Sequence, residues 1–155
     1  MGLTKSFSPD QFHRALESWQ WLGVEDKSPI FTSLFGDVFF QSRDGFWLLD
    51  TLEATLTRPW ASTGELRATL GTTDGQDRFL LAGLAASAER QGIIPTAAQV
   101  YGFKIAPVLG GKIGIGNVEA IDFVVSLNIL GQLHEQVRNL PPGTRISEFT
   151  IQTDS

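Results

Sequence analysis

The chain has 155 residues, of which 42% are hydrophobic and 19% charged, and this composition is typical of a folded domain with its own apolar core. The absence of Cys excludes a disulfide framework, a thiolate metal site and thiol catalysis. The formal net charge of −5 disfavours binding to nucleic acid, and no apolar run is long enough to span a bilayer. We therefore expect one domain over 1–155, without a secretory signal, in a reducing compartment such as the cytoplasm.

The first predicted element is a helix that begins after Ser8. The segment Ser8-Pro9-Asp10-Gln11 has the pattern of a capping box, with Pro at the first helical position. Apolar residues then recur at helical spacing as far as Trp19 or Trp21, so we expect this helix to cover a sheet.

Four strands are predicted next, from short apolar runs separated by turn residues. They cover 30–35, 37–42, 46–49 and 51–60, and Ser42-Arg43-Asp44-Gly45 has the residue types of a hairpin turn. Phe39 and Phe40 are consecutive in a strand, so their side chains should face opposite sides of the sheet. An antiparallel meander is the simplest connection for strands this close in sequence.

A helical section follows the strands. A short helix is predicted from a cap at 62 or 63 to Gly71. A longer amphipathic helix is predicted from a cap at 72 or 73 to Gly92, because its Leu and Ala residues keep helical spacing throughout.

The last third of the chain is predicted to contain a strand over 99–105 and a glycine-rich loop over 107–116. Residues 117–140 fit either one helix or a strand followed by a helix, and their length favours the helix. An edge strand is predicted over 146–151. The fold class is therefore α+β: an N-terminal helix, an antiparallel β-meander, central helices, a further strand and a C-terminal helix packed on the sheet.

No catalytic, cofactor-binding or metal-binding residues are predicted. The glycine-rich loop lacks the Ser or Thr that a P-loop needs after its Lys, since Ile113 follows Lys112. His13 and His134 are far apart and have no spaced ligand partners, so both are expected to be surface or hydrogen-bonded helix residues. The sequence contains no serine nucleophile motif.

An acidic region lies between Asp37 and Asp77, which contains seven carboxylates and three arginines. Such a surface favours a cationic partner, and the alternative is a solvated face that keeps the protein soluble. The candidate partner-binding residues are Asp37, Asp44, Asp50 and Glu53.

Five motifs follow one another in an informative order. They are Leu34–Phe40, Gly45–Asp50, Tyr101–Gly111, Asn117–Glu119 and Leu130–His134. From about 19 to 146, this series resembles the C-terminal domain family of immunity proteins that protect bacteria from their own type VI secretion DNase effectors. The Tyr-Gly-Phe motif and the Pro-x-Leu-Gly-Gly that follows it are the most specific part.

The resemblance implies a non-catalytic protein of the bacterial cytoplasm that binds and neutralises a cognate, basic toxin. It also implies a structural role for the family motif residues Gly36, Asp37, Tyr101, Gly102, Phe103, Pro107, Gly110 and Gly111. The rival hypothesis is a small-ligand-binding or enzymatic domain with a pocket near 107–116, around Tyr101, Lys104 and His134. A structural homo-oligomer is a third reading, and the sequence leaves the oligomeric state open.

Overall fold

The computed structural model describes residues 2–141 and 151. Its main sheet is antiparallel with strand order β1-β2-β3-β4-β5, which confirms the predicted meander and the α+β class. The strands are β1 (Thr4–Lys5), β2 (Ser28–Ser33), β3 (Val38–Ser42), β4 (Gly45–Asp50) and β5 (Thr55–Trp60). β1 was not expected, and the strand predicted over 51–60 begins at Thr55 because residues 51–54 form a turn.

The N-terminal helix has the predicted cap. In α1 (Pro9–Leu16) the Ser8 hydroxyl accepts from the backbone N–H of Gln11 at 3.1 Å, and the Gln11 side chain accepts from the Ser8 N–H at 2.9 Å. The α-helix is shorter than predicted. The chain continues as a 3₁₀ helix, η1 (Glu17–Leu22), which ends at Gly23 with φ +77°.

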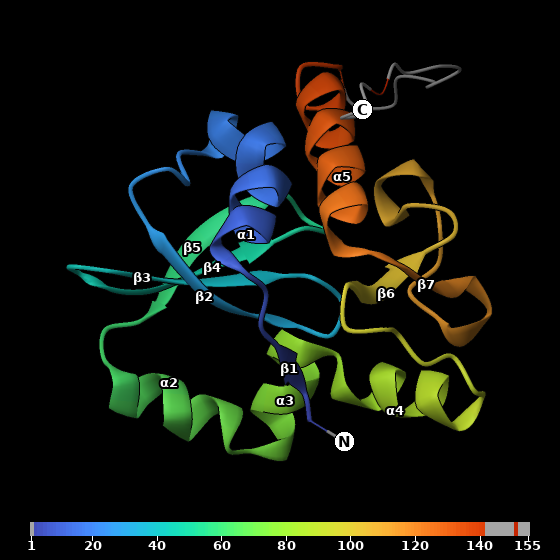
Figure 1. Cartoon of the computed structure of the whole chain (residues 1–155), viewed down its shortest axis with the longest axis horizontal. Coiled ribbons are helices and arrows are strands. Elements are labelled where there is room, and N and C mark those ends of the chain that lie inside the picture. Colours follow the sequence, from blue (N-terminus) through green and yellow to red (C-terminus); the bar gives the residue numbers. More distant parts are fainter. Residues whose placement is uncertain (1, 142–150, 152–155) are drawn as a thin grey trace.

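The segment 117–140 contains a strand and then a helix, so the single helix favoured from the sequence is wrong. β7 (Val118–Asp122) pairs with β6 (Gln99–Phe103) in a second, two-stranded sheet. α5 (Phe123–Val137) starts at once after β7, because the Asp122 carboxylate accepts from the N–H of Val125 at 3.0 Å and caps the helix. α5 lies beside α1 on one face of the main sheet (Figure 1).

The opposite face of the main sheet is covered by α2 (Thr63–Leu70) and α3 (Thr73–Leu80), and α4 (Ala82–Arg90) follows them and packs against the small sheet (Figure 1). The single helix predicted from 72 or 73 to Gly92 is therefore wrong: it is divided at Leu81, which has φ +51°. The Asp77 carboxylate accepts from the N–H of Gly83 at 3.1 Å across this break and compensates for a lost helical hydrogen bond.

The core lies on both faces of the main sheet, as the consecutive Phe39 and Phe40 require. Phe40 packs in the cluster under α1 and α5, while Phe39 packs with Trp60 in the cluster under α2 and α3. Both phenylalanines are fully buried, and each contributes about 2 to 3 kcal/mol through burial. A third cluster joins Phe35 and Tyr101 to α4.

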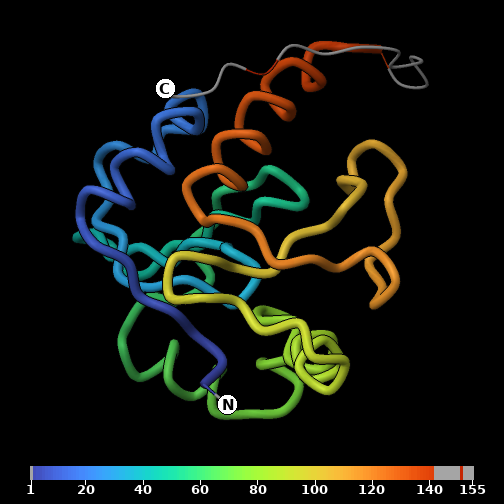
Figure 2. Tube along the Cα trace, turned by 45° about the vertical axis from the view of Figure 1, so that its right-hand side comes forward, coloured from blue at the N-terminus to red at the C-terminus, as the bar shows by residue number. Residues whose placement is uncertain are grey.

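The glycine-rich loop follows β6, which ends at Phe103 rather than at 105. It contains two short 3₁₀ turns, η2 (Pro107–Leu109) and η3 (Ile115–Asn117). Figure 2 shows this loop extending from the small sheet beside α5. The strand predicted over 146–151 lies outside the described residues apart from Ile151. Among the described residues, no helix combines the length and the hydropathy that a membrane span requires.

Candidate functional site

A pocket of about 360 Å³ opens between the small sheet, α5 and the segment that follows β6. We call it the loop pocket. α5 supplies one wall with Ser126, Ile129, Leu130 and Leu133. The small sheet and the following loop supply the others with Gly102, Phe103, Lys104, Ile105, Ala106, Pro107, Leu109, Glu119 and Ile121. Phe35, Thr51 and Leu52 complete the lining, so the pocket is mostly apolar with a few polar groups.

Gly102 explains why space remains between the small sheet and α5. A β-carbon at this position would lie 2.8 Å from Cγ2 of Ile121 and 3.8 Å from Oγ of Ser126. The first distance is shorter than real contacts allow, so a larger residue would displace Ile121 and enter the space in front of α5.

The loop over the pocket is held by the side chain of Asn117 together with backbone hydrogen bonds. Asn117 accepts from the N–H of Ile105 at 2.9 Å and donates to the carbonyls of Ile105 and Lys112 at 2.8 and 2.9 Å. Only glycine is accommodated at position 111 of this loop, because a β-carbon there would lie 1.8 Å from the Ile105 carbonyl oxygen. The loop is thus preformed, and Ile105 and Ile113 remain 58% and 53% exposed on it.

The charged groups around the loop pocket are mainly carboxylates. Glu119 and Lys104 line it directly. Asp50 and Glu53 flank the lining residues Thr51 and Leu52, and the Asp50 carboxylate holds their turn by accepting from the N–H groups of Leu52 and Glu53 at 2.9 and 3.1 Å. One carboxylate and one lysine thus line the pocket, and two further carboxylates stand next to lining residues in the sequence.

A chain of hydrogen bonds connects Asp37 to His134 through Thr51. The Asp37 carboxylate accepts from the N–H and the hydroxyl of Thr51, and the Thr51 carbonyl accepts from Nε2 of His134 at 3.0 Å. Burial, with a smaller contribution from the nearby Asp50 charge, raises the pKa of Asp37 to about 7. Burial also lowers the pKa of His134 below its usual value.

The predicted partner-binding residues are only partly brought together. Asp37, Asp50 and Glu53 lie at one end of β3 and β4, but Asp37 is buried, with 8% of its surface exposed. Asp44 lies at the opposite end, in the β3–β4 hairpin. Hydrogen bonds from Ser42 and Trp47 lower the pKa of its carboxyl group.

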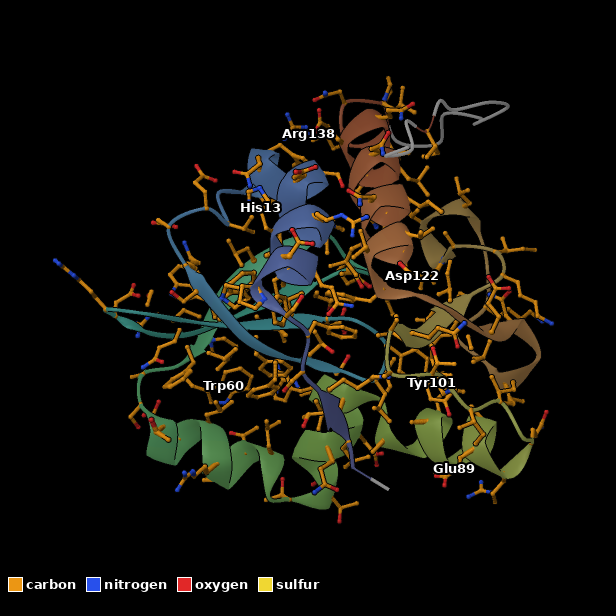
Figure 3. The ribbon with its side chains drawn as sticks, in the orientation of Figure 1. His13, Trp60, Glu89, Tyr101, Asp122 and Arg138 are labelled. Atoms are coloured by element: carbon orange, nitrogen blue, oxygen red, sulfur yellow. The ribbon has the colours of Figure 1, made fainter. Side chains whose placement is uncertain are left out.

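The family motif residues lie where the two sheets, α4 and the loop meet. Gly36 has φ +89°, and a β-carbon there would press on Leu127 at 3.2 Å. The Tyr101 hydroxyl donates to the Ile93 carbonyl at 2.7 Å, and Figure 3 shows Tyr101 between the small sheet and α4. Pro107 starts η2, and Gly110, with φ +96°, ends it. Gly102 and Phe103 line the loop pocket.

The residues of the rival hypothesis do not share a site. Lys104 lines the loop pocket, but Tyr101 and His134 do not, because their side chains bond to Ile93 and Thr51. In the described part of the chain, no group of three or more His, Asp and Glu side chains is placed to hold a metal ion. Sequence reasoning did not select Glu119 as a binding residue, although its two-residue spacing from Ile121 places both on one face of a strand.

Comparisons with known proteins point to one family. The family model described as "T6SS immunity protein Tdi1, C-terminal" matches residues 76–134, which confirms the resemblance noted from the sequence. The crystal structure of Atu4351 from Agrobacterium tumefaciens is similar with a TM-score of 0.50 and 15% identity, over 84% of this chain and 67% of that chain. This identity makes the second likeness one of fold alone. The search of curated proteins gives no match.

Proposed function

We propose that this protein is a non-catalytic immunity protein that binds a secreted bacterial effector and blocks its activity. The observation that carries the proposal is the match of residues 76–134 to the type VI secretion immunity family. This match supports an immunity role, and the identity of the effector and the mode of inhibition are our inference.

The hydrogen bonding of the titratable groups supports binding rather than turnover. Asp37 and His134 have unusual pKa values, which often mark catalytic groups. Both side chains, however, bond to Thr51 inside the fold, and neither lines the loop pocket. These hydrogen bonds join the start of β3, the turn after β4 and α5. We therefore assign Asp37 and His134 a structural role.

The charge distribution supports a basic effector such as a DNase. A nuclease needs cationic groups to hold DNA, and an acidic inhibitor attracts such a surface during association. Exposed Glu53 and partly buried Asp50 offer this charge on one turn, whereas the Asp44 carboxylate at the hairpin lies 3.9 Å from Nε of Arg58. We place the encounter in the bacterial cytoplasm, where an incoming DNase would reach the chromosome.

The experiment is a capture from the source bacterium with tagged protein, followed by expression of the captured effector in a bacterial host. Co-expression of this protein should restore growth that the effector abolishes. Absence of a toxic partner, or growth arrest despite co-expression, would contradict the immunity function.

The acidic turn is tested separately by Glu53→Lys, with Glu89→Lys as the control. Both residues are exposed, and Glu89 lies on α4, on the other face of the small sheet (Figure 3). We expect Glu53→Lys alone to slow association, with a loss that shrinks at high salt. Equal association rates for both variants would remove the acidic turn from the interface and leave the immunity function standing.

A further inference from the structure

We propose that the loop pocket is the effector's docking site, and that it receives a bulky apolar side chain flanked by cationic groups on the effector surface. This proposal rests on the proposed immunity function, and it names the place and the chemistry of recognition. The partner is a protein, and a small molecule in the pocket is an outcome that would overturn the proposal.

The first argument is the position of the family match. Apart from Phe35, Thr51 and Leu52, every residue that lines the loop pocket lies within 76–134. The β3–β4 hairpin and the turn after β4 lie outside that range. The part of the chain that matches the family model therefore supplies most of the pocket lining.

The second argument is that the site is preformed. Asn117 fixes the backbone on both sides of the loop, and Gly111 allows the close approach that this requires. Ile105 is nevertheless 58% exposed at the pocket, and Ile113 is 53% exposed on the same loop. A rigid loop that holds apolar side chains in solvent loses little conformational entropy on binding, which favours association.

The third argument is charge complementarity. Glu119 lines the pocket, and Asp50 and Glu53 flank its lining residues Thr51 and Leu52, whereas Lys104 is the one cation among the lining residues described. With Lys112 of the loop included, an apolar group that enters here meets three carboxylates and two lysines in and beside the pocket. Lys or Arg residues beside that group on a basic effector would pair with these carboxylates.

The fourth argument is size. A pocket of about 360 Å³ that is walled by Ile129, Leu130 and Leu133 can enclose one large side chain and exclude water from it. Anchors of this kind, usually Trp, Tyr or another large residue in a desolvated pocket, dominate the energetics of many protein interfaces.

The test fills the pocket and measures binding to the captured effector. Ala106→Phe places a ring at the lining residue Ala106, and Ala68→Phe adds the same ring at an exposed position of α2. We expect Ala106→Phe to weaken effector binding at least about 30-fold, as loss of an anchor does, and Ala68→Phe to leave it unchanged. Circular dichroism and thermal unfolding establish that both variants are folded.

A second variant covers the case in which Ala106→Phe does not fold. Ile105→Asp changes a side chain that is mostly exposed, while Asn117 holds only the backbone of Ile105. We expect at least about 10-fold weaker binding from the loss of one apolar contact. In methyl NMR spectra of the wild type, the effector should shift Ile105, Ile129 and Leu130, whereas Leu66 under the main sheet should not move.

The possible failures are distinguishable. If the wild type protects against the effector and both pocket variants bind it as tightly as the wild type does, the docking proposal is wrong and the immunity function stands. If the wild type binds no effector, both proposals fail together. A small molecule that stays bound to the purified wild type, is lost in Ala106→Phe and leaves effector binding unaffected would assign the pocket to a ligand instead.

Discussion

The Asp37 carboxylate accepts two hydrogen bonds from Thr51, one from its backbone N–H at 2.8 Å and one from its hydroxyl at 2.7 Å. The same threonine accepts from His134 through its carbonyl oxygen. Thr51 thereby connects the start of β3 to α5, and its two titratable partners have pKa values shifted in opposite directions.

Asp37→Asn should change how stability depends on pH. Because the pKa of Asp37 is raised to about 7 in the folded state, the folded protein binds a proton that the unfolded chain releases near its ordinary pKa of 3.8. The contribution of Asp37 to the free energy of unfolding is fully present below pH 4. It is lost as the pH rises to 7, by about 1.4 kcal/mol per pH unit. Asn keeps an oxygen acceptor for Thr51 but does not titrate, so the variant should not lose stability as the pH rises.

Urea unfolding between pH 4 and 8 measures the effect. The variant should match the wild type near pH 4 and exceed its stability by up to about 4 kcal/mol at pH 8. Glu135→Gln, at an exposed position of α5, is the control for removal of one negative charge. A constant difference between Asp37→Asn and the wild type over the whole range would contradict the proposed titration.

His134→Phe should destabilise the protein by about 1 to 3 kcal/mol at pH 7.5, because the buried Thr51 carbonyl loses its donor. The pKa of His134 is lowered, so its contribution is present above its ordinary value near 6.5 and is lost as the pH falls below it. The gap between wild type and variant should therefore narrow at pH 5. His13→Phe, at a side chain that is 78% exposed, should show neither effect.

Gly111→Ala should disrupt the loop over the pocket, because its new methyl group would meet the Ile105 carbonyl oxygen at 1.8 Å. We expect a loss of about 2 kcal/mol or more in unfolding free energy and faster amide exchange at Ile105. Gly114→Ala lies in the same loop and has no atom within 4 Å of the added carbon. It should leave both quantities nearly unchanged, and equal effects of the two substitutions would contradict this account.

Two glycines in helices should respond to Ala with opposite signs. At Gly131 in α5, a β-carbon would lie 2.6 Å from the Ser18 carbonyl oxygen, so Gly131→Ala should separate α5 from η1 and lower the melting temperature by several degrees. At Gly83 in α4, the nearest atom is an Asp77 oxygen at 3.5 Å. Gly83→Ala should stabilise the helix by up to about 1 kcal/mol, as seen in thermal unfolding.

Local signals in the sequence predicted much of the fold. Ser8 and Gln11 mark the start of α1 because both capping partners are within four residues of each other. The hairpin between β3 and β4 follows from the turn residues 42–45, with Ser42 opposite Gly45. These features depend on chemistry between near neighbours, which periodicity and turn composition detect.

The errors arise where tertiary contacts decide between local alternatives. Leu81 divides α3 from α4 in a left-handed conformation, which leucine rarely adopts, and the Leu and Ala spacing continues across the break. Val118 and Ile121 keep a helical register with Val125, although the first two lie in β7, because pairing with β6 overrides that pattern.

The site was predicted less well than the fold. The burial of Asp37 depends on Thr51, fourteen residues away, and no local pattern indicates a buried carboxylate. The sequence indicated a possible pocket near 107–116, and the structure has one beside 102–109. Its walls come from four separate segments, and Tyr101 and His134 are excluded by contacts that spacing alone does not reveal.

The two outer edges of the main sheet each contain a proline. β1 pairs only with Thr32 and Ser33, so the rest of β2, including Pro29, forms one edge, and β5 with Pro59 forms the other. Proline has no N–H, so each edge lacks a donor that an incoming strand would need. Sheet extension by a second chain is thus disfavoured at both sides. Self-association into β-aggregates through these two edges is opposed by the same feature.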